Sequence, residues 1–109
     1  MRWYRDLYLG PNAEQNMQKI RKKASEGTPM LGVYYVTLPA TEHNLLDIFH
    51  NSMLMQPLFA KHQCTDVVGV AEGKQEAVRL AETIIGNVFK ETGALDLRSY
   101  FREEDFVEI

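Results

Sequence analysis

The sequence predicts a small α/β domain with the element order βαβαβαβ, a mostly parallel four-stranded sheet with three helices. Two apolar runs, 31–38 and 66–71, are rich in β-branched and aromatic residues, as strands covered on both faces are. A later segment, 77–89, repeats apolar residues at helical spacing over several turns. Strand-like and helix-like segments alternate three times, which is typical of parallel sheets with right-handed crossovers.

The first half of the chain contains two predicted strands with a helix between them. A short strand is expected at 6–9, and the run at 31–38 is the second strand. The helix begins after the turn at 10–12 and ends before Gly27 and Pro29, because a glycine followed by proline is a common helix stop. Its apolar stripe consists of Ala13, Met17, Ile20 and Ala24.

A second helix is predicted over 42–56. Thr41 is a suitable N-cap residue, and Pro57 ends the helix because the residue before a proline avoids helical geometry. The apolar stripe of this helix would be Leu45, Ile48, Phe49 and Met53.

The remaining segments are a strand, a helix and an edge strand. Strand 66–71 leads into the helix at 77–89, which ends at Gly93. The last strand, 95–101, alternates apolar and polar residues, as a strand with one wet face does. The tail at 102–109 is acidic with apolar residues interspersed.

The chain is short enough to form one domain, 1–109. Strands that are apolar on both sides favour helices on both faces of the sheet, in three layers. A two-layer arrangement, with all helices on one face, remains open.

Composition excludes several classes of partner. The formal charge is −3, so no domain-wide basic field exists to hold nucleic acid. No apolar run approaches the ~18 residues of a membrane span. A single cysteine, Cys64, fits a reducing compartment. We therefore expect a cytoplasmic protein without a nucleic-acid or membrane partner.

In a parallel sheet the turns after successive strands lie on one edge, where open α/β sheets bind ligands. We therefore expect a ligand-binding edge at the carboxyl ends of the strands. Its candidate residues are Asn12, Thr41, Asn44, Glu72, Gly73 and Lys74.

The corner at Gly73-Lys74 has two interpretations. It lacks the nucleotide-binding P-loop pattern, because three residues separate Gly69 from Gly73 and Gln75 follows Lys74. Free backbone N–H groups at the helix start, with the lysine, could still attract an anion. The alternative is a plain turn, with Gly69 relieving crowding between strand and helix.

A histidine cluster suggests a second site. On a helix over 42–56, His43, Asp47 and His50 would share one face at spacings i, i+4 and i+7. Two imidazoles and a carboxylate suit a divalent metal, and His62 or Cys64 could complete the shell. The alternative is a solvated polar face.

The segments 53–55 and 57–59 are more apolar than one helical stripe requires. Methionines of this kind fill core gaps, or they form an adaptable surface that meets a partner. The aromatic start, Trp3-Tyr4, and the apolar residues of the tail could join such a surface.

The stretch VVGVAEGKQEAVRLAETIIGNVFKETGALDLRSYF, with YYVTLPATEHNLLDI, resembles a family of short bacterial α/β proteins of uncharacterised function. The resemblance implies the α/β layout and no activity, and it assigns no site residue.

These observations predict a non-catalytic module that acts by binding a partner chain or by self-association as a homo-oligomer. The first alternative is a small-ligand or anion site at the strand ends, either a binding site or the active site of an enzyme. The second is the metal site. No cofactor is expected.

Overall fold

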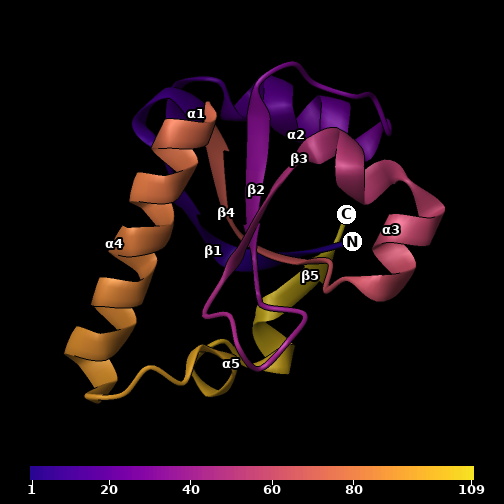
Figure 1. Cartoon of the computed structure of the whole chain (residues 1–109). Coiled ribbons are helices and arrows are strands. Elements are labelled where there is room, and N and C mark those ends of the chain that lie inside the picture. The colour runs from indigo at the N-terminus through magenta and orange to yellow at the C-terminus, as the bar shows by residue number, and fades with distance from the viewer.

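The computed structural model describes the backbone of all 109 residues and every side chain except those of Ala60 and His62. One five-stranded sheet runs through the molecule (Figure 1), in the order β3-β2-β4-β1-β5. Its strands are β1 (Arg2–Leu9), β2 (Val33–Thr37), β3 (Asp47–His50), β4 (Asp66–Glu72) and β5 (Phe106–Glu108). Among these strands one neighbouring pair, β1 and β4, is parallel, and the other three pairs are antiparallel.

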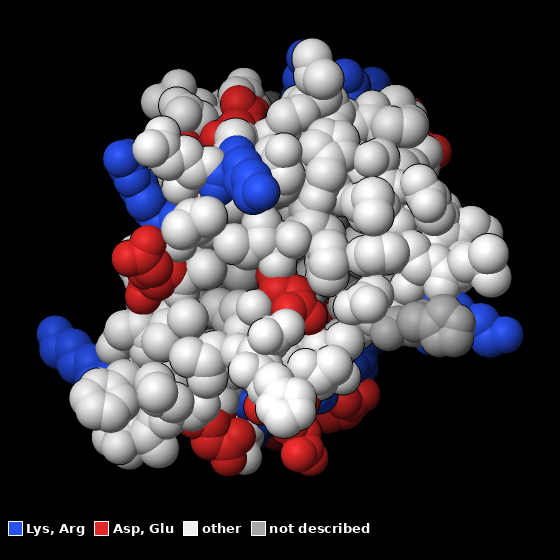
Figure 2. All heavy atoms as spheres, in the orientation of Figure 1, with Lys and Arg blue, Asp and Glu red and all other residues white. Residues whose placement is uncertain are grey.

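Helices cover both faces of the sheet, so the three-layer arrangement favoured by the apolar strands is present. The helical elements are α1 (Pro11–Gln15), α2 (Met17–Ser25), η1 (Asn51–Met55), α3 (Pro57–His62), α4 (Lys74–Thr92), α5 (Leu97–Tyr100) and η2 (Glu103–Asp105), where η marks a 3-10 helix. The long helix α4 packs on one face, and α1, α2 and η1 pack on the other. Uncharged atoms cover most of the centre of the surface in Figure 2.

Each face of the sheet has its own apolar core. Under α4, Ile84 and Val88 belong to one core with Val36 and Val68 of the sheet, and all four are fully buried. The second core consists of Trp3, Ala13, Met17, Ile20, Met30, Val33, Tyr35, Leu54, Val67 and Val70. A Cβ on Gly69 would lie 2.9 Å from a Leu80 methyl and 3.2 Å from an Ile84 methyl, which confirms that this glycine lets strand and helix approach.

The predicted mostly parallel four-stranded sheet with three helices is wrong. Strand β2 pairs with β4 in antiparallel register, with Tyr35 opposite Val70. A parallel pairing would need a crossover helix between these two strands. Instead the chain after β2 folds back as the antiparallel neighbour β3 and then returns through η1 and α3.

The predicted helix over 42–56 is the main source of that error, because 47–50 is a strand and 51–55 a 3-10 helix. The loop before β3 is closed by polar side chains: Asp47 accepts hydrogen bonds from the Ala40 N–H (3.1 Å) and from the Asn44 side-chain amide (3.0 Å). Ile48 and Phe49 then pack on opposite cores, as neighbours in a strand do.

The predicted edge strand at 95–101 is also wrong, since it contains the short helix α5. Leu97 and Phe101 are both buried, and their spacing of four fits a helix as well as an alternating strand. Asp96 selects the helix by acting as its N-cap. Its carboxylate accepts hydrogen bonds from the Ser99 N–H (3.3 Å) and from the Ser99 hydroxyl (2.7 Å). The edge strand is formed by the tail, as β5.

Other elements are confirmed by the structure. The strands at 31–38 and 66–71, the helix ending at Gly93 and the helix after Pro11 all form, the last with a break at Asn16. None of the helices in the described chain has the length and apolar character needed to cross a bilayer.

Candidate functional site

The predicted ligand-binding edge is divided between two ends of the sheet. Because β1 and β4 are parallel, Asn12, Glu72 and Gly73 do come together, around a hollow of about 620 Å³. Thr41 and Asn44 line a separate hollow of about 210 Å³, together with Arg98. They lie at the other end because the last residue of β2, Thr37, pairs with the start of β4.

The backbone donors at the first end are already used by a side chain of the protein, Glu76. Its carboxylate accepts hydrogen bonds from the N–H groups of Asn12 (3.1 Å), Ala13 (3.3 Å) and Glu72 (2.8 Å). A carboxylate at the start of two helices takes the place that a bound anion would occupy. The corner at Gly73 is therefore closed by the protein itself.

The other polar groups of this corner also serve the turn. Gly73 has a φ of 91°, which favours glycine, and its N–H donates to the Gly32 carbonyl at 2.7 Å. The Glu72 carboxylate accepts a hydrogen bond from the Asn16 side-chain amide at 2.7 Å. Lys74 is exposed. Sequence reasoning missed Glu76, although an acid at the third helical position is a known N-terminal signal.

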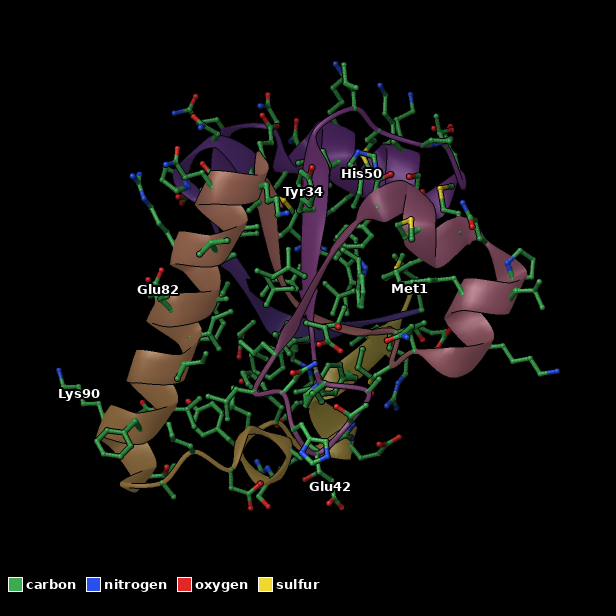
Figure 3. All side chains as sticks on the ribbon, in the orientation of Figure 1. Met1, Tyr34, Glu42, His50, Glu82 and Lys90 are labelled. Atoms are coloured by element: carbon green, nitrogen blue, oxygen red, sulfur yellow. The ribbon has the colours of Figure 1, made fainter. Side chains whose placement is uncertain are left out.

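The histidine cluster does not assemble as predicted. His43 lies in the loop before β3, whereas Asp47 and His50 belong to β3, where an odd spacing sends side chains to opposite faces. His50 packs edge-on against Tyr34 (Figure 3) and its Nδ1 lies 2.8 Å from the Ser52 hydroxyl. Among the side chains that the structure describes, no three His, Cys, Asp or Glu residues could hold one metal ion.

The His62 side chain, a possible further ligand, lies outside the described ones. Cys64 is half-buried, and burial raises its pKa, which disfavours the thiolate that binds metals or attacks substrates.

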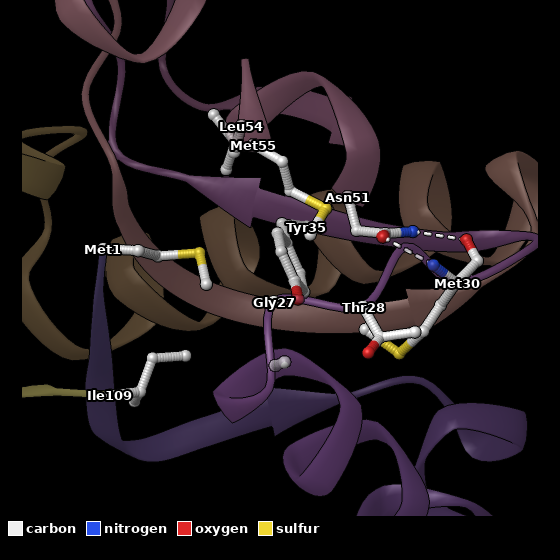
Figure 4. A pocket seen from close by; sticks show the side chains of 10 residues that line it. Met1, Gly27, Thr28, Met30, Tyr35, Asn51, Leu54, Met55 and Ile109 are labelled. Carbon is white, nitrogen blue, oxygen red and sulfur yellow. Dashed lines mark hydrogen bonds between the residues drawn. The ribbon is translucent and has the colours of Figure 1, made fainter. Parts of the chain in front are cut away.

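A different cavity is lined mostly by apolar side chains (Figure 4). It has a volume of about 380 Å³ and lies where the end of α2, the start of η1 and the two ends of the chain meet. We call it the methionine groove. Its lining residues are Met1, Ala24, Gly27, Thr28, Met30, Tyr35, Asn51, Leu54, Met55 and Ile109.

The floor and walls of the methionine groove come from different parts of the fold. Tyr35 of β2 is 2% exposed, and Figure 4 shows its hydroxyl directed towards the turn at Gly27. Met55, 39% exposed, and Ile109, 45% exposed, lie at its margins. The segment 53–55 and the apolar tail were expected to share a surface, and Met55 and Ile109 do so here. Trp3 is instead buried in the core.

Asn51 holds the groove wall in place. The residue is 1% exposed, and its side chain makes three hydrogen bonds to the backbone. The side-chain oxygen accepts a hydrogen bond from the Met30 N–H (2.9 Å), and the side-chain NH₂ group donates to the carbonyls of Met30 (2.6 Å) and Val33 (2.8 Å). These bonds join the first residue of η1 to the segment that leads into β2.

The side chains that line the methionine groove are mostly apolar. None of the lining side chains is charged, and the Asn51 amide is occupied by backbone groups. Three of the chain's five methionines contribute flexible, polarisable walls that adapt to different apolar shapes. The Tyr35 hydroxyl supplies one polar group at the floor.

We expect the protein to lose stability at alkaline pH, because burial raises the pKa of Tyr35 to about 12. In the unfolded chain a tyrosine ionises near pH ~10, so between these values the unfolded state binds fewer protons and stability falls as pH rises. The free energy of unfolding should therefore drop by about 1.4 kcal/mol between pH ~8 and pH ~11 from this residue alone.

Urea unfolding at both pH values, on the wild type and on Tyr35→Phe, measures this contribution by difference. The variant keeps the other tyrosines, including Tyr4, whose pKa burial also raises. Equal pH dependence in the two proteins would show that the Tyr35 phenol is not protected from ionisation.

In comparisons with protein-family models, curated proteins and solved structures, nothing matches this chain. The resemblance of segments 34–48 and 67–101 to short bacterial proteins therefore stays a prediction.

Proposed function

We propose that this protein is a non-catalytic binding module whose methionine groove accepts an apolar side chain from a partner protein. The observation that carries the proposal is an open cavity of about 380 Å³ walled by three methionines and without a charged lining side chain. That volume is in the ~300–1,000 Å³ range of cavities that bind ligands.

The surroundings of the methionine groove support a protein partner. Leu58 of helix α3, which follows η1 in the chain, is 77% exposed. Apolar residues that remain in water beside a cavity are typical of protein interaction sites. A cytoplasmic location, expected from the single cysteine, is part of the proposal.

Self-association by sheet extension has weaker support. The two edge strands of the sheet, β3 and β5, have only four and three residues. Short edge strands are a common protection against edge-to-edge pairing. The groove is therefore the better candidate for a contact surface.

We expect the methionine groove to select binding peptides from a random dodecapeptide library displayed on phage. Binding of a selected peptide should shift the ¹³C-methyl NMR signals of Met1, Met30 and Met55. Met17 and Met53 do not line the groove and are internal controls. Failure of the library to yield any peptide that moves the three groove signals would contradict the proposal.

Two variants of η1 sharpen the test. Met55→Glu places a carboxylate at the groove margin and should weaken peptide binding more than about tenfold, because an unpaired charge resists burial. Met53→Glu makes the same change at a similarly exposed site outside the groove, and it should leave binding unchanged.

Light scattering is expected to give the mass of the single chain, 12.5 kDa. A dimer that Met55→Glu dissociates would instead assign the methionine groove to a second copy of this chain.

A further inference from the structure

Helix α2 carries a strip of positive charge on a protein whose formal charge is −3. We call Arg21 and Lys22 the basic strip; Lys19 and Lys23, the other cations of α2, line a separate hollow together with Glu72. None of these four cations makes an ion pair with a side chain that the structure describes. In Figure 2, Lys and Arg atoms lie at the top of the molecule, above the position of α2 in Figure 1.

The basic strip adjoins the methionine groove. Arg21 and Lys22 line a second hollow of about 370 Å³, together with Trp3, Ser25 and Ile109. Ile109 also lines the methionine groove, so the two hollows meet at this residue. An extended segment with an apolar side chain in the groove would continue past Ile109 towards the two cations.

Arg21 is positioned for such a contact. Its guanidinium carbon lies 5.4 Å from the centre of the Trp3 ring, in a cation–π arrangement that restricts the side chain. A guanidinium stacked on a ring keeps its N–H edge available, and that planar edge matches the two oxygens of a carboxylate.

We infer that the segment bound by the methionine groove is acidic, with carboxylates beside its apolar anchor that pair with Arg21 and Lys22. This inference rests on the proposed function and specifies the partner's chemistry. Charge complementarity at the rim of an interface chiefly sets partner choice and association rate. Nucleic acid fits less well, because four cations in a net acidic protein give little counterion release and an apolar cavity offers nothing to phosphates.

The composition of the selected dodecapeptides tests the inference first. We expect enriched peptides to place Asp or Glu within a few residues of a large apolar side chain. Enrichment of neutral or basic peptides that still shift the groove methionines would overturn the acidic partner while leaving the proposed function intact. No enriched peptide at all would overturn the proposed function itself.

Charge reversal then locates the contact, with affinity measured by the fluorescence of Trp3, the single tryptophan. Arg21→Glu/Lys22→Glu should weaken binding of a selected acidic peptide by about tenfold at low salt. Lys22→Glu alone should weaken it less, and it leaves the Arg21–Trp3 contact in place. A peptide with lysine at each acidic position should prefer the double variant.

The matched control for Lys22→Glu is Lys90→Glu, on the exposed surface of α4 (Figure 3), which makes the same charge change of one cation to one anion outside both hollows. Equal weakening by Lys90→Glu would overturn the inference, since net charge would then explain the effect. Phosphatidylserine vesicles and a single-stranded oligonucleotide are the competing probes. Tighter binding of either one than of the peptide, lost in Arg21→Glu/Lys22→Glu, would also overturn it.

Discussion

Replacing Glu76 by alanine is expected to lower the free energy of unfolding by about 2 kcal/mol. The Glu76 carboxylate accepts three backbone N–H groups, and two of these bonds are partly buried. Without the carboxylate, the donors at the start of α1 and at the end of β4 lose their hydrogen-bond partner, and water can replace that partner only in part. Loss of a negative charge near two helix N-termini adds to the cost.

Urea unfolding followed by circular dichroism measures this effect, with Glu82→Ala as the control. Glu82 is exposed on the same helix (Figure 3), and its removal should change stability by less than about 0.5 kcal/mol. Equal losses of unfolding free energy in the two variants would show that the effect comes from the helix propensity of glutamate in α4 and not from the hydrogen bonds of Glu76.

A second substitution tests the geometry of the same corner. Gly10 has extended backbone angles that alanine can adopt, with φ −67° and ψ 156°. A Cβ at this position would overlap the Glu76 carboxylate, so Gly10→Ala must expel that group from its three donors. We expect Gly10→Ala to cost about as much as Glu76→Ala, near 2 kcal/mol.

The double variant distinguishes this contact from a general loss. Once Glu76 is alanine, the methyl group of Gly10→Ala has space, so adding it should cost close to nothing. The coupling energy of the cycle should then be about 2 kcal/mol. Additive costs would mean that the carboxylate does not occupy the position beside Gly10.

The same contact explains why the strand-to-helix corner was ambiguous in the sequence. A glycine and a lysine before a helix are compatible with an anion site and with a closed turn. The residue that decides between them, Glu76, is separated from Asn12 by 64 positions along the chain. Sequence position alone cannot show that this acid faces the start of another helix.

The long amphipathic helix and the two continuous apolar strands were predicted correctly, whereas two segments whose apolar residues fit more than one element were not. The 19-residue helix α4 has enough turns to exclude a strand. In contrast, Leu97 and Phe101 fit both periods, and the Asp96 cap, a local hydrogen bond, selects the helix. The stripe predicted over 42–56 consisted of four apolar residues, and pairing of Tyr35 with Phe49 made part of it a strand.

One wrong element changed both candidate sites. With a strand at 47–50, the crossover between β2 and β4 is absent, and Thr41 moves to the end of the sheet opposite Gly73. The same strand separates Asp47 from His50. The methionine groove was only partly foreseeable, because Met1, Met30 and Met55 are brought together by tertiary packing and share no local pattern.

Asn51→Ala is expected to destabilise the fold by about 3 kcal/mol. The Asn51 side chain is almost completely buried and satisfies three backbone groups of Met30 and Val33. Removing it leaves a donor and two acceptors without their partner in an apolar setting, which is among the most costly changes to a protein interior. Asn51→Asp should cost about 4 kcal/mol, because a carboxylate oxygen would face the two carbonyls.

Asn44→Ala is the matched control, since Asn44 is exposed and its side chain bonds to Asp47 in the hairpin loop. It should cost less than about 1 kcal/mol. Hydrogen exchange at the Met30 amide supplies a local measurement: Asn51→Ala should accelerate it more than exchange in α4. Because Asn51 fixes Met30 against η1, the groove should also lose affinity for its peptides before the protein unfolds. Retained affinity with a loosened Met30 would show that the groove wall does not depend on Asn51.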